Sequence, residues 1–209
     1  MNAEQFQRQT NVSRETLELF EHWYNLLSHW NKRINLVAPS TLHDFWLRHA
    51  LDSWKIVELL PKRTKTILDM GAGAGFPGIA LAIGLKDKSG SHIDLVEANG
   101  KKCNFLRTVI RELGVPAKAT QVRVESFEHQ PYDVITARAF APLSKLLDYS
   151  HPFWSENTQA LFPKGENWQR EVDVARTEYD FDLTTIDSQT NENAKTLTVT
   201  NLATKGDNQ

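Results

Sequence analysis

A glycine-rich stretch at residues 67–83, ILDMGAGAGFPGIALAI, is the part of the sequence best suited to bind a ligand. It begins as an apolar run that includes Asp69, continues with four glycines within eight residues, and ends in residues that favour a helix. Glycine admits positive φ and lets backbone N–H groups approach a ligand closely. Because four glycines cost more chain entropy than a simple turn requires, the stretch predicts a ligand-binding turn between a strand and a helix.

Two motifs overlap in this stretch and predict different ligands. Residues 73–78 fit G-x-G-x-x-G, the fingerprint of a dinucleotide-binding βαβ unit, whereas residues 69–75 fit acid-x-G-x-G-x-G. A dinucleotide needs an open helix N-terminus for its pyrophosphate, and Phe76 and Pro77 place a bulky ring and a residue without an N–H group there. Asp69 would repel a pyrophosphate but suits the cationic sulfonium and amino groups of S-adenosylmethionine. S-Adenosylmethionine is therefore the favoured cofactor, and a nicotinamide dinucleotide of an oxidoreductase is the alternative.

A second acid, Glu97, has the spacing expected of a ribose ligand. It ends the run HIDLVE and lies 22 residues after Gly75, close to the spacing of roughly 20 residues found in dinucleotide-binding units. A carboxylate at that place accepts hydrogen bonds from ribose hydroxyls, and it fits both cofactors equally. The alternative is an acid that only caps a helix beginning near Asn99.

The chain beyond residue 65 alternates between strand-length and helix-length segments. Apolar runs of strand length occur at residues 66–70, 92–97, 119–124, 132–138 and 158–164, and helices are expected at 77–85, 99–113, 142–151 and 165–176. This alternation predicts a parallel sheet with right-handed crossovers. Two further runs, 179–187 and 194–202, are separated by six residues, which is too short for a crossover helix and suits an antiparallel hairpin. We expect an α/β fold with a seven-stranded, mostly parallel sheet and a C-terminal antiparallel hairpin.

The first 60 residues predict a helical segment that precedes this sheet. Ser13 can cap a helix whose apolar residues recur at spacings of three and four from Leu17 to Trp30. A second helix is expected over residues 41–60, with His49 among its inward positions, and Pro61 stops it. The predicted domains are therefore a helical segment, residues 1–60, and a cofactor-binding domain, residues 61–209.

Composition and charge restrict the location and the partners. The 209 residues carry a formal net charge of -2, and the sequence has a single cysteine, no signal-peptide pattern and no apolar run long enough to span a membrane. These features predict a soluble cytoplasmic protein without a membrane partner. Residues 99–124 nevertheless hold six basic residues against one acidic residue, whereas residues 165–209 hold four against nine. The asymmetry predicts a local phosphate-binding face, although a solvated helix face would look similar. The histidines have no recognised ligand spacing, and we expect no metal site.

Seven motifs together resemble a known family. They are HWNKRINL (29–36), RHALDS (48–53), ILDMGAGAGFPGIAL (67–81), VEANGKKCNFLR (96–107), VRVESF (122–127), DVITARAFAPL (133–143) and PKG (163–165). Their order and spacing resemble those of the small-subunit (16S) ribosomal RNA guanine-N7 methyltransferase family, also called glucose-inhibited division protein B, over nearly the whole chain. The resemblance implies a Rossmann-like class I methyltransferase fold, S-adenosylmethionine as cofactor, and 16S ribosomal RNA or the small ribosomal subunit as partner of a protein that we expect to be a monomer.

The resemblance also implies roles for individual residues. The cofactor-contacting positions of the family correspond to Gly71, Phe76, Val124, Glu125 and Arg138. The pattern of the glycine turn and its two acids adds Asp69, Gly73, Gly75 and Glu97 as candidate cofactor-binding residues. The candidate RNA-binding residues are Lys101, Lys102, Arg107, Arg123 and Lys164.

The chemistry of guanine N7 requires little from the protein. The N7 lone pair carries no proton, so we expect no general base, and positioning can supply most of the rate. Arg138 is the candidate catalytic residue, as a group that orients the cofactor or the base, and the alternative is a strand-end arginine paired with Asp133 or Glu125. A non-catalytic RNA- or protein-binding module on the same fold is the remaining alternative function.

Overall fold

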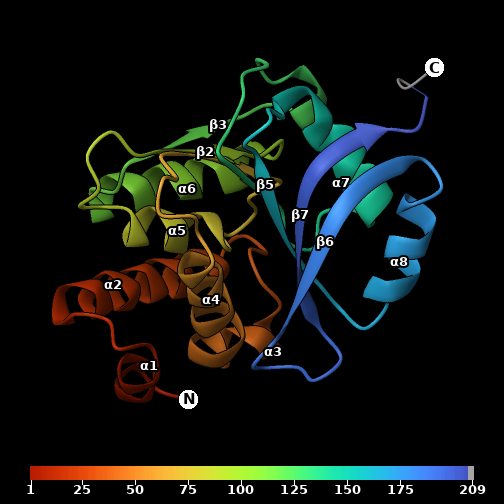
Figure 1. Ribbon diagram of the computed structural model, residues 1–209. Coiled ribbons are helices and arrows are strands. Elements are labelled where there is room, and N and C mark those ends of the chain that lie inside the picture. The colour runs from red at the N-terminus through yellow and green to blue at the C-terminus, as the bar shows by residue number, and fades with distance from the viewer. Residues whose placement is uncertain (207–209) are drawn as a thin grey trace.

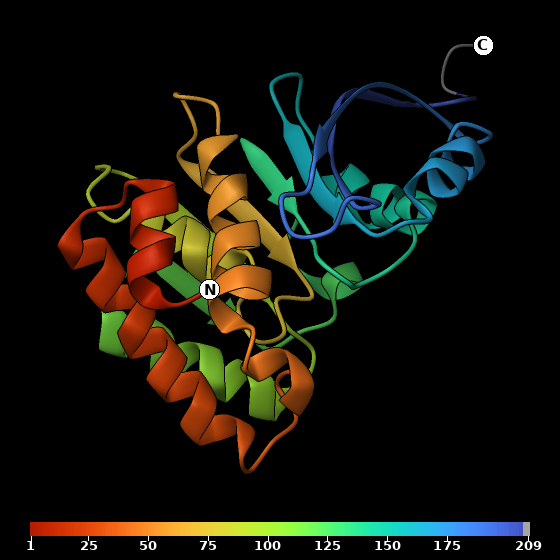
Figure 2. The same ribbon diagram turned by 90° about the horizontal axis from the view of Figure 1, so that it is seen from below.

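A seven-stranded sheet runs through the centre of the molecule, and helices cover both of its faces (Figures 1 and 2). The computed structural model describes residues 1–206. The strand order is β3-β2-β1-β4-β5-β7-β6; the strands are β1 (Thr66–Met70), β2 (His92–Val96), β3 (Ala117–Thr120), β4 (Val134–Thr136), β5 (Gln159–Lys164), β6 (Tyr179–Asp187) and β7 (Lys195–Thr204). Strands β1 to β5 pair in parallel, and β7 is antiparallel to both β5 and β6. The predicted sheet with its C-terminal hairpin is confirmed.

The helices form two layers with separate hydrophobic cores. One layer holds α1 (Ala3–Thr10), α2 (Arg14–Asn31), α3 (Pro39–Leu42), the π-helix η1 (Phe45–Leu51), α4 (Asp52–Glu58), α5 (Gly78–Gly84) and α6 (Gly100–Leu113). The other holds the 3₁₀-helices η2 (Val124–Ser126) and η3 (His151–Phe153), α7 (Leu143–Ser150) and α8 (Trp168–Ala175). In β1, Ile67 belongs to the first core, and Leu68 and Met70 belong to the second. Burial on both faces explains why the strand is an almost continuous apolar run.

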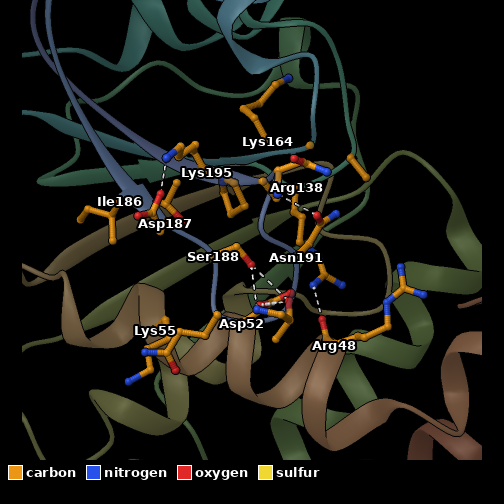
Figure 3. Close-up of a pocket in the computed structure, with 18 of the residues that line it drawn as sticks. Arg48, Asp52, Lys55, Arg138, Lys164, Ile186, Asp187, Ser188, Asn191 and Lys195 are labelled. Atoms are coloured by element: carbon orange, nitrogen blue, oxygen red, sulfur yellow. Dashed lines mark hydrogen bonds and ion pairs between the residues drawn. The ribbon is translucent and has the colours of Figure 1, made fainter.

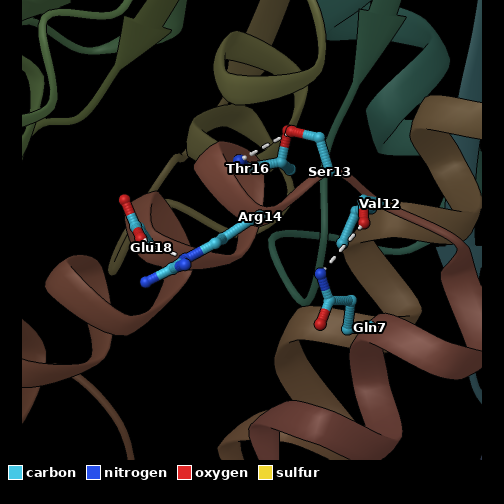
Figure 4. Close-up of polar contacts among 6 residues, drawn as sticks. All are labelled: Gln7, Val12, Ser13, Arg14, Thr16 and Glu18. Carbon is cyan, nitrogen blue, oxygen red and sulfur yellow. Dashed lines mark hydrogen bonds and ion pairs between the residues drawn. The ribbon is translucent and has the colours of Figure 1, made fainter.

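The N-terminal helices are tied to the sheet through the first core. Phe6, Phe20 and Trp23 of α1 and α2 belong to the same buried cluster as Phe105 of α6. Ser13 caps α2, as predicted: its Oγ accepts the N–H of Thr16 at 3.2 Å (Figure 4). At the same junction the Gln7 side chain of α1 donates to the Val12 carbonyl at 3.4 Å, and Arg14 pairs with Glu18 at 3.0 Å (Figure 4). Beyond this junction α2 packs against α6, where the ring centroids of Trp30 and Phe105 lie 5.8 Å apart.

The single helix predicted over residues 41–60 is wrong. The chain makes a short α3, turns at His43 and Asp44, and then forms the π-helix η1 before α4. The wider π turn carries an extra residue, and His49, Ala50 and Leu51 at its end are all buried. His49 in η1 lies against the side chains of Phe76 and Arg138, which follow β1 and β4.

Two predicted strands end earlier than expected. The third was expected at residues 119–124, but β3 spans Ala117–Thr120 and pairs with β2 only as far as Val96. Val122 and Val124 are apolar because they pack against the second core outside the sheet. The fourth strand was expected at 132–138 and ends at Thr136. The segments after β3 and β4 leave the sheet at its carboxyl edge and form loops beside the glycine turn.

The turn of the C-terminal hairpin lies against the N-terminal helices (Figure 1). The Thr190 hydroxyl donates to Asp52 Oδ1 at 2.6 Å, and the Gln9 side chain donates to Gln189 Oε1 at 3.0 Å. Segments about 140 to 180 positions apart in the sequence are therefore in direct contact. This contact closes one side of a large cavity.

Candidate functional site

The turn after β1 folds over the carboxyl ends of β1 and β2. The N–H groups of Gly71 and Ala72 both donate to the Val96 carbonyl, at 2.9 and 3.0 Å. Gly71 and Gly73 have φ angles of +69° and +56°, a region that L side chains rarely adopt. A Cβ atom built on Gly73 would lie 3.7 Å from the Gly71 carbonyl oxygen, and no other heavy atom beyond its two chain neighbours would lie within 4 Å. The turn therefore presents bare backbone at Gly73.

A cavity of about 430 Å³ opens in front of this turn. Its volume lies within the range of roughly 300–1,000 Å³ that is typical of small-ligand sites. The predicted cofactor residues that line it come from loops after four strands; they are Gly71, Gly73, Phe76, Glu97, Val124, Glu125 and Arg138. The cavity lies at the carboxyl edge of a parallel sheet, where ligands of such folds bind.

Glu97 joins the end of β2 to the glycine turn. Its Oε2 accepts the N–H of Gly73 at 2.9 Å, and its Oε1 accepts the N–H of Asn99 at 2.7 Å. The cap of α6 is Asn99, whose side chain accepts the N–H groups of Lys101 and Lys102. Each Glu97 oxygen keeps a lone pair for a hydroxyl donor. Glu97 therefore orders the turn and the start of α6 and also borders the cavity. A role at the helix start and a role as a ribose ligand are thus compatible.

Asp69 and Gly75 do not line the cavity. The Asp69 carboxyl is fully buried, and its Oδ2 accepts the N–H of Gly78, the first residue of α5, at 3.0 Å. Burial raises the pKa of Asp69 to about 7, against the opposing effect of the Gly78 hydrogen bond. A Cβ atom on Gly75 would lie 2.5 Å from Ile79 Cγ1, so this glycine permits close helix packing. The Asp69 carboxyl, which we expected next to the cofactor, therefore lies behind the turn.

Arg138 bridges the cavity and the N-terminal helices. Its guanidinium donates to His49 Nδ1 at 2.8 Å and to the Arg48 carbonyl at 3.3 Å, and it lies 4.9 Å from the centroid of the Phe76 ring. Pairing with Asp133 is not observed, since Asp133 binds the N–H groups of Lys65 and Thr66 at the opposite end of the strand. Burial lowers the pKa of Arg138 from its usual value, but a guanidinium remains charged.

His49 is a neutral base in this arrangement. Burial, followed by the charges of Arg138 and Arg48, lowers the pKa of His49 to about 3. Its ring stacks on Phe76 with centroids 4.6 Å apart and planes 19° apart. Because Nδ1 accepts from Arg138, the ring proton is on Nε2. The π-helix η1 thus holds the arginine through a neutral acceptor.

The predicted RNA-binding residues fall into two groups. Lys102 and Arg123 line the rim of the smaller cavity, and Lys101 and Arg107 are exposed on α6 nearby. Lys164 is different: its ammonium pairs with Glu171 at 2.5 Å and donates to the Ala141 carbonyl at 2.8 Å, and its side chain is 9% exposed. The structure therefore places two of the predicted basic residues, Lys102 and Arg123, at the cavity, and two, Lys101 and Arg107, on the exposed surface of α6, while Lys164 holds the loop after β4.

A larger cavity of about 1,420 Å³ adjoins the first, and Arg138, Ala139 and Phe140 line both. Side chains from the N-terminal helices and from the hairpin point into it from opposite sides (Figure 3). Asp52 lies on one wall and bonds Thr190 of the hairpin turn, and burial raises the pKa of Asp52. The loop after β4 therefore separates a small cavity beside the glycine turn from a large one beneath the hairpin.

Several lining residues were not identified from the sequence. Leu36 and Val37 of the N-terminal segment line the smaller cavity, and Asn31 fixes them by accepting both of their N–H groups at 2.9 and 3.0 Å. Phe140 and Tyr149 line it from the other side. The only available signal was that these residues, Tyr149 apart, lie in or beside the motifs HWNKRINL and DVITARAFAPL. His49 was expected only as a packing residue.

Metal-ligand clusters and membrane-spanning helices are both absent from the part of the chain that the structure describes. Within residues 1–206, no group of three or more His, Cys, Asp or Glu side chains is placed to hold a metal ion. No helix in that part of the chain is long and apolar enough to cross a membrane. Cys103 is buried in α6, and burial raises the pKa of its thiol.

Comparison with known protein families identifies the chain. The family model described as GidB, rRNA small subunit methyltransferase G, matches residues 16–198. The chain belongs to this family. The match includes the glycine turn, Glu97, Arg138, β6 and the beginning of β7, and the GidB family uses S-adenosylmethionine as its cofactor.

Curated relatives carry the corresponding name. The Ribosomal RNA small subunit methyltransferase G of Rhizobium meliloti (strain 1021) is 43% identical over 197 residues, which cover 92% of this chain and 92% of that protein. The protein of the same name from Parvibaculum lavamentivorans is 40% identical and covers 97% of this chain and 90% of the relative. Nearly full-length similarity at this level extends the family assignment across both helical layers.

Solved structures with a similar fold are more distant in sequence. Magnesium protoporphyrin IX methyltransferase from Synechocystis, with bound S-adenosylmethionine, has a TM-score of 0.61 at 10% identity, covering 90% of this chain and 98% of that one. A S-adenosylmethionine-dependent methyltransferase from Aquifex aeolicus has a TM-score of 0.61 at 13% identity, covering 82% and 96%. These similarities show that the predicted class I methyltransferase fold is correct.

Proposed function

We propose that this chain transfers a methyl group from S-adenosylmethionine to N7 of a guanine in 16S ribosomal RNA. The observation that carries the proposal is the cavity of about 430 Å³ at the carboxyl edge of β1 and β2, bordered by bare backbone at Gly73 and by the Glu97 carboxylate. Family membership and the fold support the same activity.

The residues of this cavity fit the proposed cofactor. A positive φ and open space at Gly73 leave room for a ligand against the turn, and the Glu97 oxygens have lone pairs for ribose hydroxyls. Val124 and Glu125 close the opposite rim, and the Arg138 guanidinium supplies a positive charge for the cofactor carboxylate. When bound, S-adenosylmethionine supplies an electrophilic methyl group on a positively charged sulfur.

The same geometry argues against the nicotinamide alternative. A dinucleotide needs free N–H groups at the start of the helix after β1 for its pyrophosphate. The N–H of Gly78 is already bonded to Asp69, and the N–H of Ile79 donates to the Gly75 carbonyl at 2.8 Å. Asp69 thus favours the methyl donor by occupying the helix terminus, and not by contact with the sulfonium.

Positioning supplies the catalysis that we propose. Guanine N7 attacks with a lone pair that carries no proton, so no residue needs to remove one. Arg138 is held by the neutral His49 and by the Arg48 carbonyl. This arrangement fixes the guanidinium between the two cavities, where it orients the cofactor with respect to a base that approaches from the larger cavity.

The surroundings of the cavity suggest how RNA is held. Lys102 and Arg123 at the rim, with Lys101 and Arg107 on α6, provide cations for phosphates. Residues 61–209 form the cofactor-binding domain in this proposal. Residues 1–60 supply Leu36 and Val37 to the wall of the smaller cavity and His49 to the wall of the larger one. We further propose that the protein acts in the cytoplasm as a monomer.

Methyl transfer to isolated small ribosomal subunits tests the proposal. Subunits from cells that lack the protein should accept a labelled methyl group from S-adenosylmethionine in its presence, and calorimetry should show binding of S-adenosylhomocysteine but not of NAD. Cofactor binding with transfer at background level would support a non-catalytic RNA-binding module instead. Binding of NAD alone would support an oxidoreductase.

A further inference from the structure

We propose that Phe140 is the surface on which the target guanine stacks while it accepts the methyl group. This inference rests on the proposed function and adds the residue that receives the base. Phe140 lines both cavities, and its side chain remains 39% exposed. A large aromatic ring left in solvent at the junction of two cavities is an available face for a ligand.

The backbone around Phe140 is arranged to present the ring. Ala139 has a φ of +53°, a left-handed conformation that costs an alanine about 1–2 kcal/mol. The residue at this bend separates Arg138, which is directed to His49 and Phe76, from Phe140, which lies over Gly71. Strained residues of this kind are concentrated at ligand-binding sites.

The contact with Gly71 defines one side of the ring. A Cβ atom on Gly71 would lie only 2.4 Å from Phe140 Cδ2, so the ring rests directly on the glycine turn of the smaller cavity. Tyr149 supports it further, with ring centroids 5.6 Å apart. Phe140 is therefore in contact with the turn that borders the cofactor cavity, while part of its surface remains open.

The segment that carries the ring is fixed at both ends. Arg138 is bonded to His49 and to the Arg48 carbonyl, the Ala141 carbonyl accepts from Lys164 at 2.8 Å, and the N–H of Leu143 donates to Glu171 at 2.8 Å. The Lys164–Glu171 ion pair, which is only partly exposed, thus serves to hold this loop. A ring on a loop fixed in this way is pre-organised, and a stacked base does not have to order it.

The chemistry of the transfer favours an aromatic neighbour for the base. The N7 lone pair forms a bond to the methyl carbon while the bond from that carbon to sulfur breaks, and the electron pair of the broken bond stays on sulfur. The positive charge therefore passes from the sulfonium to the purine ring. An aromatic face binds a positively charged ring more strongly than a neutral one. Phe140 therefore binds the reacting guanine more tightly as positive charge develops on the purine. The larger cavity, of about 1,420 Å³, has space for a nucleotide extruded from folded RNA.

Substitutions that separate the aromatic face from apolar bulk test this role. Phe140→Leu keeps an apolar side chain over Gly71 and removes the π surface, whereas Phe140→Tyr keeps both and is the matched control. We expect Phe140→Leu to lower kcat/KM for methyl transfer by about tenfold to hundredfold, in line with the loss of one base-stacking contact. Phe140→Tyr should stay within about threefold of the wild type, and both variants should bind S-adenosylhomocysteine as the wild type does.

A binding measurement tests the same role without turnover. Guanosine 5′-monophosphate and its N7-methylated form are titrated into protein saturated with S-adenosylhomocysteine. The wild type and Phe140→Tyr should bind the methylated nucleotide, whose base carries a positive charge, about fivefold more tightly than guanosine 5′-monophosphate. Phe140→Leu should bind the two equally.

The outcomes distinguish this inference from the proposed function. A preference for the methylated nucleotide that survives in Phe140→Leu, or is absent from the wild type, would overturn the stacking role. So would an equal loss of cofactor binding and transfer in Phe140→Leu, which would make the ring a packing residue of the cofactor cavity. If the wild type shows the preference but methylates no ribosomal RNA, the proposed function fails and the base site stands.

Discussion

Alanine at Gly73 should weaken cofactor binding without unfolding the protein. Gly73 has a φ of +56°, and its Cβ atom would point into open space where the cofactor is proposed to lie. A left-handed alanine costs about 1–2 kcal/mol, and the smaller conformational entropy of the unfolded chain offsets roughly 0.4–1 kcal/mol of this. The net loss in the free energy of unfolding is therefore about 1 kcal/mol. The added methyl group competes with the cofactor for space, which we expect to weaken its binding by about tenfold to hundredfold.

The chain offers a matched control for the backbone strain. Gly114, at the end of α6, has a φ of +59°, and a Cβ atom there would meet no heavy atom within 4 Å. Gly114→Ala should lose the same stability in urea titrations and keep full affinity for S-adenosylhomocysteine in calorimetry. Equal affinities in Gly73→Ala and Gly114→Ala would refute the assignment of the turn as a cofactor site. A loss of binding confined to Gly73→Ala would support it.

Three further predictions concern the arginine, its histidine partner and the basic rim. Arg138→Ala should lower kcat/KM for methyl transfer by about tenfold to hundredfold, because a hydrogen bond to a charged group contributes about 1.5–3 kcal/mol; if thermal unfolding shows that lost folded protein accounts for the whole decrease, the arginine is structural. The pKa of His49 falls from 6.5 to about 3 on folding, so the unfolded chain takes up a proton at a higher pH than the folded protein does. The free energy of unfolding therefore decreases as the pH drops below 6.5, by at most about 1.4 kcal/mol per pH unit. His49→Asn should lack this component in urea titrations at a series of pH values, and parallel curves for both proteins would contradict the buried neutral imidazole. Replacing Lys102 and Arg123 together by alanine should weaken RNA binding. The slope of log K against log salt should fall by about 1.4, or about 0.7 for each lost contact with single-stranded RNA. Alanine at Lys205, which lines neither cavity, should leave the slope unchanged, and an unchanged slope in the double variant would place the RNA elsewhere.

Local spacing was enough to predict much of the cavity beside the glycine turn. The strand, the glycines and Glu97 follow one another within about 30 residues, and the parallel βαβ unit that they define places them at one edge of the sheet. The seven-stranded sheet was also predictable, since each observed strand overlaps one of the runs of strand length in the sequence. The position of Asp69 was not predictable, although β1 has the expected ends, because its carboxylate turns to the N–H of Gly78 at the start of α5. Phe140 was not predictable either, because its place over Gly71 follows a left-handed bend at Ala139.

Contacts between distant segments explain the remaining errors. Arg138 and His49 are 89 positions apart, and only the π turn of η1 brings the imidazole to the guanidinium. Lys164 has the charge expected of an RNA ligand, yet α8 supplies Glu171 to neutralise it. Val122 extended an apolar run that predicted a longer third strand, because burial against the second core and burial in a sheet leave the same pattern in the sequence.

Mapping of N7-methylguanine in 16S ribosomal RNA tests the central claim most directly. Aniline cleavage followed by primer extension reveals each N7-methylated guanine as a stop. RNA from cells that contain the protein should show a stop at a guanine that is absent from cells without it, and expression of the wild type, but not of Gly73→Val, should restore the stop. Identical patterns of stops with and without the protein would contradict its assignment as a guanine-N7 methyltransferase of the small subunit.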